Sequence, residues 1–148
     1  MRVDFYQLSR DPAQAVPSLC ARLVQAHPVM EEGRREQRAH TMLAREVAKW
    51  ANAVRKAQIV AAQHPGQVLD LIHSDFHRNP MQVLERIYGF IGMDMTEAAR
   101  TGMLQRIAEK PELQHGVHRY DVADFGLTKE EIRERFGGYV EKFDLLNG

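Results

Sequence analysis

The stretch that decides the fold is Val3–Ser18, which reads VDFYQLSRDPAQAVPS. Its first part, residues 3–8, carries aromatic and β-branched side chains that favour a short strand. Asp11 followed by Pro12 then predicts the start of a helix. The aspartate can accept a free backbone amide, and proline at the first helical position gives up no hydrogen bond. We expect this helix to span residues 12–26.

The rest of the sequence predicts one more strand and further helices. The compact apolar run at residues 67–73 has the composition of a buried strand. Helices are expected over residues 31–63, from Pro80 to about residue 91, from residue 97 to before Pro111, and from Lys129 to Phe143. Trp50 is expected on the buried stripe of the first of these. Two strands that no hairpin turn connects are expected to be parallel, and a lone pair is an incomplete sheet. The predicted fold class is α/β, mostly helical, with two short parallel strands near residues 3–8 and 67–73.

Local signals mark where these helices begin and where one is strained. Asn79 is an expected N-cap, and Thr96–Ala99 is expected to open the next helix. Thr128 followed three residues later by Glu131 is the pattern of a capping box, in which each side chain accepts the other's backbone amide. Pro17 lies inside the first helix and predicts a kink or irregular first two turns, because proline removes one backbone hydrogen bond.

The composition excludes several classes of protein. The 148 residues are 44% hydrophobic and 27% charged, which argues against a disordered or a collagen-like chain. Twenty basic residues balance twenty acidic ones, so nucleic acid is not an expected partner. No run approaches the roughly 20 apolar residues that cross a bilayer, so no membrane association is expected.

Two further features favour a cytoplasmic chain. The residues after Met1 lack the apolar core of a signal peptide. The single cysteine, Cys20, excludes an intrachain disulfide and a cysteine-based zinc site. We expect Cys20 to be a small buried helix residue.

Four segments, in order along the chain, resemble motifs of the sulfotransferases that use 3′-phosphoadenosine 5′-phosphosulfate (PAPS). They are Tyr6–Ser18, Leu71–Pro80 (LIHSDFHRNP), Val83–Gly92 (VLERIYGFIG) and His115–Leu127 (HGVHRYDVADFGL). In that family a strand ends in Arg-Asp-Pro or a similar triplet, and a serine follows eight residues after the arginine. Arg10 and Ser18 have this spacing. The resemblance extends from about Val3 to Leu145.

The resemblance implies a P-loop-NTPase-like sulfotransferase fold, with PAPS as the sulfate donor and a small molecule bearing a hydroxyl or amine as the acceptor. It assigns Arg10 and Ser18 to the 3′-phosphate of the nucleotide. That phosphate is a compact dianion, which a planar guanidinium matches with paired donors. A hydroxyl near the start of a helix adds a further donor. Arg119 is expected as a second phosphate contact, because related enzymes bring a basic loop over the nucleotide.

One departure from the family pattern concerns the part of the fold that precedes the Arg-Asp-Pro segment. There the family has a strand, a phosphate-binding loop rich in small residues, and a helix. No Gly-x-x-x-x-Gly-Lys sequence occurs in this chain, and the family's catalytic base also belongs to that part. Residues 1–148 are therefore expected to be the C-terminal part of one sulfotransferase domain. We expect them to hold no catalytic residue and to transfer no sulfate alone.

A second interpretation is a non-catalytic helical module for binding or assembly. The helix over residues 31–63 would dock another chain, or the open sheet edge would pair with a partner or with a second copy. The alternative for Arg10 is then a surface residue at the end of a strand, paired with Asp11 or another acid, and Ser18 is an ordinary polar position on a helix.

A third interpretation is a metal site built from histidines. In a strand, His73, Asp75 and His77 would share one face, as metal ligands must. His115 and His118 form a second pair. Because the first pattern straddles the end of the strand and the resemblance accounts for it, no metal site is expected.

Overall fold

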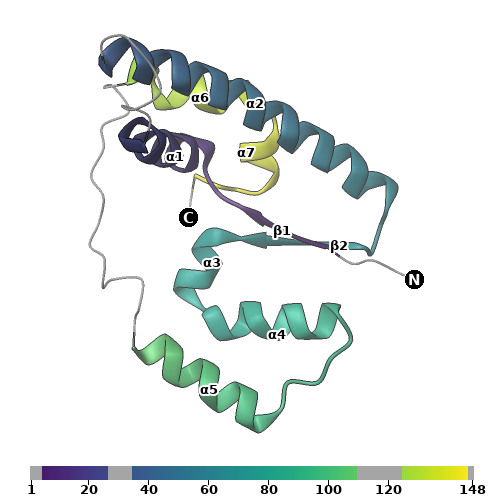
Figure 1. The fold of residues 1–148 in the computed structure, drawn as a ribbon. Helices are drawn as coiled ribbons and strands as arrows, with labels where there is room; N and C mark the ends of the chain where they lie inside the picture. The colour runs from purple at the N-terminus through teal and green to yellow at the C-terminus, as the bar shows by residue number, and fades with distance from the viewer. Residues whose placement is uncertain (1–4, 27–34, 110–124, 147–148) are drawn as a thin grey trace. The chain divides into compact units, whose positions relative to one another are not determined.

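The computed structural model describes residues 5–26, 35–109 and 125–146 (Figure 1). These residues form two strands and seven helices. In chain order they are β1 (Phe5–Ser9), α1 (Pro12–Ala26), α2 (Arg35–Gln63), β2 (Val68–Ile72), α3 (His73–Arg78), α4 (Pro80–Phe90), α5 (Glu97–Ala108), α6 (Lys129–Arg135) and α7 (Tyr139–Lys142). They divide into two compact units. The sheet unit holds β1, β2, α3, α4 and α5, and the helical unit, which begins at Arg10, holds α1, α2, α6 and α7.

The two strands of the sheet unit pair in parallel, which confirms the prediction. The register places Phe5 opposite Val68 and Ser9 opposite Ile72. β1 ends one residue later than the sequence predicts, and β2 is one residue shorter at each end. Within the described residues, each strand has only the other as a hydrogen-bonded neighbour.

Burial differs between these two strands. Leu71 of β2 is fully buried, whereas Phe5, Tyr6 and Leu8 of β1 are 61%, 67% and 46% exposed. Large apolar side chains along an open strand edge are typical of a surface that a partner covers. The exposed apolar side chains of this sheet therefore lie on β1, whereas the residues of β2 are half-buried or buried.

A short helix, α3, follows β2 directly, where the sequence predicts a strand end and a turn. The backbone is extended at Ile72 (φ −107°, ψ 131°) and helical from His73. Helical residues rotate by about 100° each, so Asp75 lies on a different side of α3 from His73 and His77. The rings of the two histidines are 4.8 Å apart. The face that these three residues would share in a strand is thus absent. In the described ranges no group of three His, Cys, Asp or Glu side chains is placed to hold a metal ion.

The predicted cap of α4 and the predicted start of α5 are confirmed. The side chain of Asn79 accepts the amide of Gln82 at 3.3 Å. The hydroxyl of Thr96 accepts an amide of the first turn of α5 at 3.2 Å. Arg86 of α4 donates to the backbone carbonyl of Asp70 in β2 at 3.1 Å, so a side-chain bond ties this helix to the sheet.

The helical unit encloses a hydrophobic core of its own. Buried side chains of α1, α2 and the C-terminal segment form it, namely Ala13, Val16, Cys20, Val24, Ala39, Leu43, Val47, Phe125 and Ile132. On α1 and α2 they recur every three or four residues, which is the spacing of one helix face. α1 is continuous from Pro12 to Ala26, and Pro17, where the sequence predicts a kink, is buried within it.

Trp50 departs from the prediction for α2. It is 42% exposed rather than part of the buried stripe. Its indole Nε1 donates to Glu46 at 3.0 Å, and the ammonium of Lys49 lies 5.6 Å from the ring centroid. An indole with a hydrogen-bond acceptor and a cation beside it can remain at the surface. Among the helices of the described ranges, none is long and apolar enough to cross a membrane.

The C-terminal helix predicted as one element is two short helices. α6 ends at Arg135 and α7 begins at Tyr139. Between them Gly137 has φ +55°, a conformation that glycine adopts without a steric cost. Gly126, just before α6, has φ +73° and lies against the ring of His40, which leaves no room for a side chain.

Candidate functional site

The junction between β1 and α1 carries the residues that the sequence assigns to a ligand. Ser9 ends β1, Arg10 and Asp11 follow, and α1 begins at Pro12. The carboxyl end of a parallel strand is the edge at which open α/β sheets bind ligands. Ser9 is fully buried, and its Oγ has no hydrogen-bond partner within the described residues. A buried hydroxyl without a partner is uncommon in folded proteins, so Ser9 holds an unused donor at this junction.

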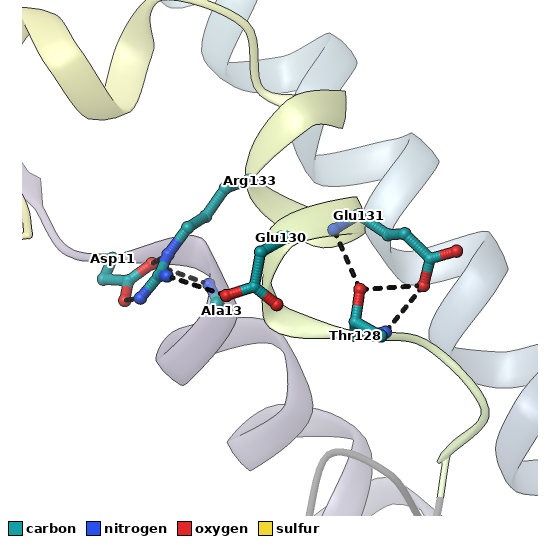
Figure 2. Close-up of polar contacts among 6 residues, drawn as sticks. All are labelled: Asp11, Ala13, Thr128, Glu130, Glu131 and Arg133. Carbon is teal, nitrogen blue, oxygen red and sulfur yellow. Dashed lines mark hydrogen bonds and ion pairs between the residues drawn. The ribbon is translucent and has the colours of Figure 1, made fainter.

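Asp11 caps α1, as the sequence predicts. It is 4% exposed. Its Oδ1 accepts the amide of Ala13 at 3.0 Å (Figure 2). Its carbonyl accepts the amides of Gln14 and Ala15, each at 3.0 Å. The side chain thus satisfies a backbone amide that the helix itself leaves free.

Asp11 also pairs with Arg133 of α6, which is 122 residues away in the sequence. Arg133 Nε lies 3.3 Å from Oδ1 and Nη2 lies 2.7 Å from Oδ2, so the guanidinium holds both carboxylate oxygens (Figure 2). Such two-pronged pairs fix geometry as well as charge. The hydrogen bond to Asp11 raises the pKa of Arg133 above its ordinary value.

α6 is itself anchored, so it holds Arg133 in place. Thr128 Oγ1 accepts the amide of Glu131 at 3.2 Å, and Glu131 Oε2 accepts the amide of Thr128 at 2.7 Å (Figure 2). These contacts confirm the predicted capping box. The backbone bond from Thr128 is the main reason that the pKa of the Glu131 carboxyl is lowered. Ile132, next to Arg133, is fully buried in the helical core.

Arg10 is exposed and has no hydrogen-bond or ion-pair partner within the part of the chain that the structure describes. The interpretation in which it pairs with Asp11 is wrong, because the oxygens of Asp11 are held by Ala13 and Arg133. Ser18 is half-buried in the second turn of α1. Among the described residues, the start of the helical unit therefore presents an unpaired guanidinium beside a carboxylate whose charge Arg133 balances.

Arg119 lies outside the described residues, as do His115 and His118. Its contact with a phosphate stays a prediction. The residue that sequence reasoning missed is Arg133. No short-range pattern marks it, and only the need of Asp11 for a basic partner could have pointed to a distant arginine.

The helical unit also contains an open groove of about 570 Å³. α2 forms one wall, and the junction between α6 and α7 forms the other. Arg55 and Arg135 are its charged residues, and neither Arg10 nor Ser18 lines it. The groove is thus separate from the residues that the sequence assigns to the nucleotide.

Two crystal structures of mycobacterial sulfotransferases are similar to this fold. For sulfotransferase STF9 from Mycobacterium avium, the TM-score is 0.73 at 22% identity, over 93% of this chain and 35% of that one. For sulfotransferase STF1 from Mycobacterium tuberculosis H37Rv, the TM-score is 0.66 at 23% identity, over 90% of this chain and 33% of that one. The chain thus spans about a third of the length of these proteins.

The predicted fold class is confirmed by this likeness, which at such low identity concerns the fold alone. No curated protein matches the sequence significantly. The profile of the family described as "Sulfotransferase family" matches residues 4–97, which is more than half of the chain. This match includes Arg10 and Ser18 and thus the whole junction between β1 and α1. The chain belongs to the sulfotransferase family.

Proposed function

We propose that this chain supplies the nucleotide 3′-phosphate site of a sulfotransferase. The complete enzyme would transfer a sulfuryl group from PAPS to the hydroxyl or amine of a small molecule. The observation that carries the proposal is that the Arg10 guanidinium is exposed and has no partner within the described residues. Arg10 lies at the carboxyl end of a parallel strand.

The chemistry of this junction suits a phosphate dianion. Arg10 offers paired N–H donors, which match phosphate oxygens in spacing and charge. The first turn of α1 adds the positive end of a helix dipole. Ser18 would add a hydroxyl donor. Because Asp11 is held by Arg133, its negative charge is balanced and does not repel the ligand.

In the reaction, the residues of this chain would bind and orient the donor. Sulfuryl transfer depends on positioning and on stabilising charge at the transferred group. Arg10 and Ser18 would hold the 3′-phosphate, Arg119 would add a second cation, and PAPS would supply the sulfuryl group. No residue of the chain is assigned as the catalytic base.

The 148 residues alone are proposed to bind the nucleotide weakly and to transfer no sulfate. They contain no Gly-x-x-x-x-Gly-Lys sequence to hold the 5′-phosphosulfate. Lacking three charge-assisted hydrogen bonds, each worth roughly 1.5–3 kcal/mol, weakens binding by about 4–9 kcal/mol. This corresponds to a factor on the order of a thousand to a million in affinity.

The binding test is a titration of the 148-residue chain with adenosine 3′,5′-bisphosphate. Amide chemical shifts of ¹⁵N-labelled protein remain informative at millimolar dissociation constants. We expect shifts at the start of α1 that Arg10→Ala abolishes. The matched control is Arg22→Ala, which removes another exposed arginine of α1. Equal binding by the wild type and Arg10→Ala would contradict the proposed site.

The activity test uses radiolabelled PAPS with a panel of phenol, alcohol and amine acceptors. We expect no labelled product from the 148-residue chain. Clear turnover would overturn the proposed inactivity. Arg119, His115 and His118 would then be the first residues to substitute.

A second candidate function, assembly, is favoured by the exposed side chains of β1. Phe5, Tyr6 and Leu8 present apolar surface beside a strand edge that no described strand pairs. The chain would then bind a partner or a second copy along that edge. Mutations in β1 would affect association but leave the shifts caused by the nucleotide unchanged.

A further inference from the structure

We infer that Arg133 is a positioning residue for the nucleotide site, because it occupies the Asp11 carboxylate and so leaves Arg10 available to an anion. This inference rests on the proposed function. Asp11 is the chain neighbour of Arg10 and the nearest acidic residue in the sequence that the structure describes. Without another partner, its carboxylate would compete with a phosphate for the Arg10 guanidinium.

The contacts of Asp11 engage both of its carboxylate oxygens. Oδ1 accepts the amide of Ala13 at 3.0 Å and Nε of Arg133 at 3.3 Å. Oδ2 accepts Nη2 of Arg133 at 2.7 Å (Figure 2). The carboxylate is also 4% exposed, so reaching another cation would require the cap and the ion pair to break.

The charge at the junction depends on the same pair. Arg10 and Asp11 alone sum to zero, whereas Arg133 adds one positive charge. Glu130 lies farther from this guanidinium, at 3.7 Å, and its side chain is largely exposed. Water screens that exposed pair more than the half-buried pair with Asp11. The net effect of Arg133 is to make the start of α1 attractive to an anion.

The location of Arg133 explains how a distant segment can tune this site. Ile132 anchors α6 in the core, and the Thr128–Glu131 capping box fixes its first turn. Arg133 is therefore held on a helix whose first turn and buried face are both fixed. The last helices of the chain are thereby coupled to the residue that follows β1, although Arg133 itself touches no ligand.

The test compares adenosine 3′,5′-bisphosphate binding by the wild type, Arg133→Met, Asp11→Asn and the double variant. Arg133→Met is expected to weaken binding about tenfold, because the released Asp11 carboxylate would compete with the phosphate for Arg10. A tenfold loss is about the effect of losing one charge-assisted contact. Asparagine retains the N-cap but has no charge to compete for Arg10. The double variant should therefore bind within about twofold of the wild type.

A merely structural role predicts the opposite rescue pattern. If Arg133 served only to anchor α6, the double variant would remain at least as weak as Arg133→Met, which would overturn the inference. Arg135→Met, which removes an exposed arginine of the same helix, is the matched control and should bind like the wild type. If Arg133→Met alone does not fold, wild-type-like binding by the double variant still supports the inference, and weak binding still contradicts it.

A further arm separates this inference from the proposed function. In an Arg10→Ala background, Arg133→Met should weaken binding clearly less than it does in the wild type, because there is no Arg10 guanidinium for the released Asp11 carboxylate to occupy. If Arg10→Ala binds as well as the wild type, the proposed nucleotide site is contradicted, and the inference that rests on it falls with it. If Arg10→Ala loses binding while Arg133→Met retains it fully, the inference about Arg133 fails and the proposed site stands.

Discussion

The two units of this chain bury their apolar residues differently. In the helical unit, Leu43 and Ile132 are fully buried, and the residues around them form a continuous core. In the sheet unit, β1 leaves Tyr6 and Leu8 67% and 46% exposed. Helices can cover one another's apolar stripes within one unit, whereas two parallel strands leave an edge without a partner. The helical unit is therefore expected to carry most of the stability, and β1 to be a surface for association.

The largest expected difference concerns two leucines with opposite environments. Leu43→Ala should lower the free energy of unfolding by about 2–5 kcal/mol, because it leaves a cavity in the helical core. Leu8→Ala, the matched control in β1, should change it by about 0.5 kcal/mol or less. Urea denaturation followed by circular dichroism measures both. Similar losses from the two variants would contradict the contrast between the units.

A second prediction concerns the reactivity of a thiol in each unit. Burial raises the pKa of Cys20 from 9.0 to about 11. At pH 7.5 its thiolate fraction should thus be about a hundredfold below that of an ordinary cysteine. Iodoacetamide should modify Cys20 at least that much more slowly than a thiol placed on β1 by Leu8→Cys in a Cys20→Ala background. In concentrated urea the two rates should converge. Fast labelling of native Cys20 would show that the helical core opens readily.

A third prediction concerns association through β1. The wild-type chain should self-associate as its concentration rises, because Phe5, Tyr6 and Leu8 are exposed along an open strand edge. Leu8→Lys places a charge on that edge and should reduce the association constant by about tenfold, since charged edge residues oppose strand pairing. Sedimentation velocity over a concentration series is the measurement. A wild-type chain that stays monomeric over the whole concentration series would contradict the proposal that the β1 edge mediates association.

The smallest expected effect concerns the capping box of α6. The backbone hydrogen bond from Thr128 lowers the pKa of the Glu131 carboxyl below its usual 4.5. A carboxyl with a lowered pKa in the folded state stabilises that state above its ordinary pKa and loses this contribution as the pH falls through the lowered value. Stability should therefore decline as the pH falls below 4.5. Glu131→Gln keeps a capping-box side chain without the charge and should decline less. Identical pH profiles in urea denaturation would show that this carboxylate contributes nothing.

Local sequence predicted much of this fold because its determinants are local. Asp11, Asn79 and Thr128 cap their helices within one turn, as predicted, and α5 begins directly after Thr96, in the segment expected to open it. The predictions were wrong where a side-chain contact or a backbone conformation outweighs the local sequence pattern. Consecutive glycines at 137 and 138 were the signal that could have divided the last helix.

The candidate site was predictable only in part. Arg10 and Ser18 lie in one short motif, so spacing and resemblance identify them. Arg133 contacts Asp11 from 122 residues away, and no sequence pattern encodes that distance. Trp50 was misplaced because Glu46, one turn earlier on the same helix, binds its indole at the surface.

The central claim is that Arg10 recognises the 3′-phosphate of the nucleotide. The most direct measurement is a cycle of four dissociation constants, for adenosine 3′,5′-bisphosphate and adenosine 5′-monophosphate with the wild type and with Arg10→Ala. We predict that the wild type prefers the bisphosphate by about tenfold or more, the value of one charge-assisted contact, and that Arg10→Ala loses most of this preference, keeping only what Ser18 and Arg119 contribute. A preference for the bisphosphate that is undiminished in Arg10→Ala would contradict the claim.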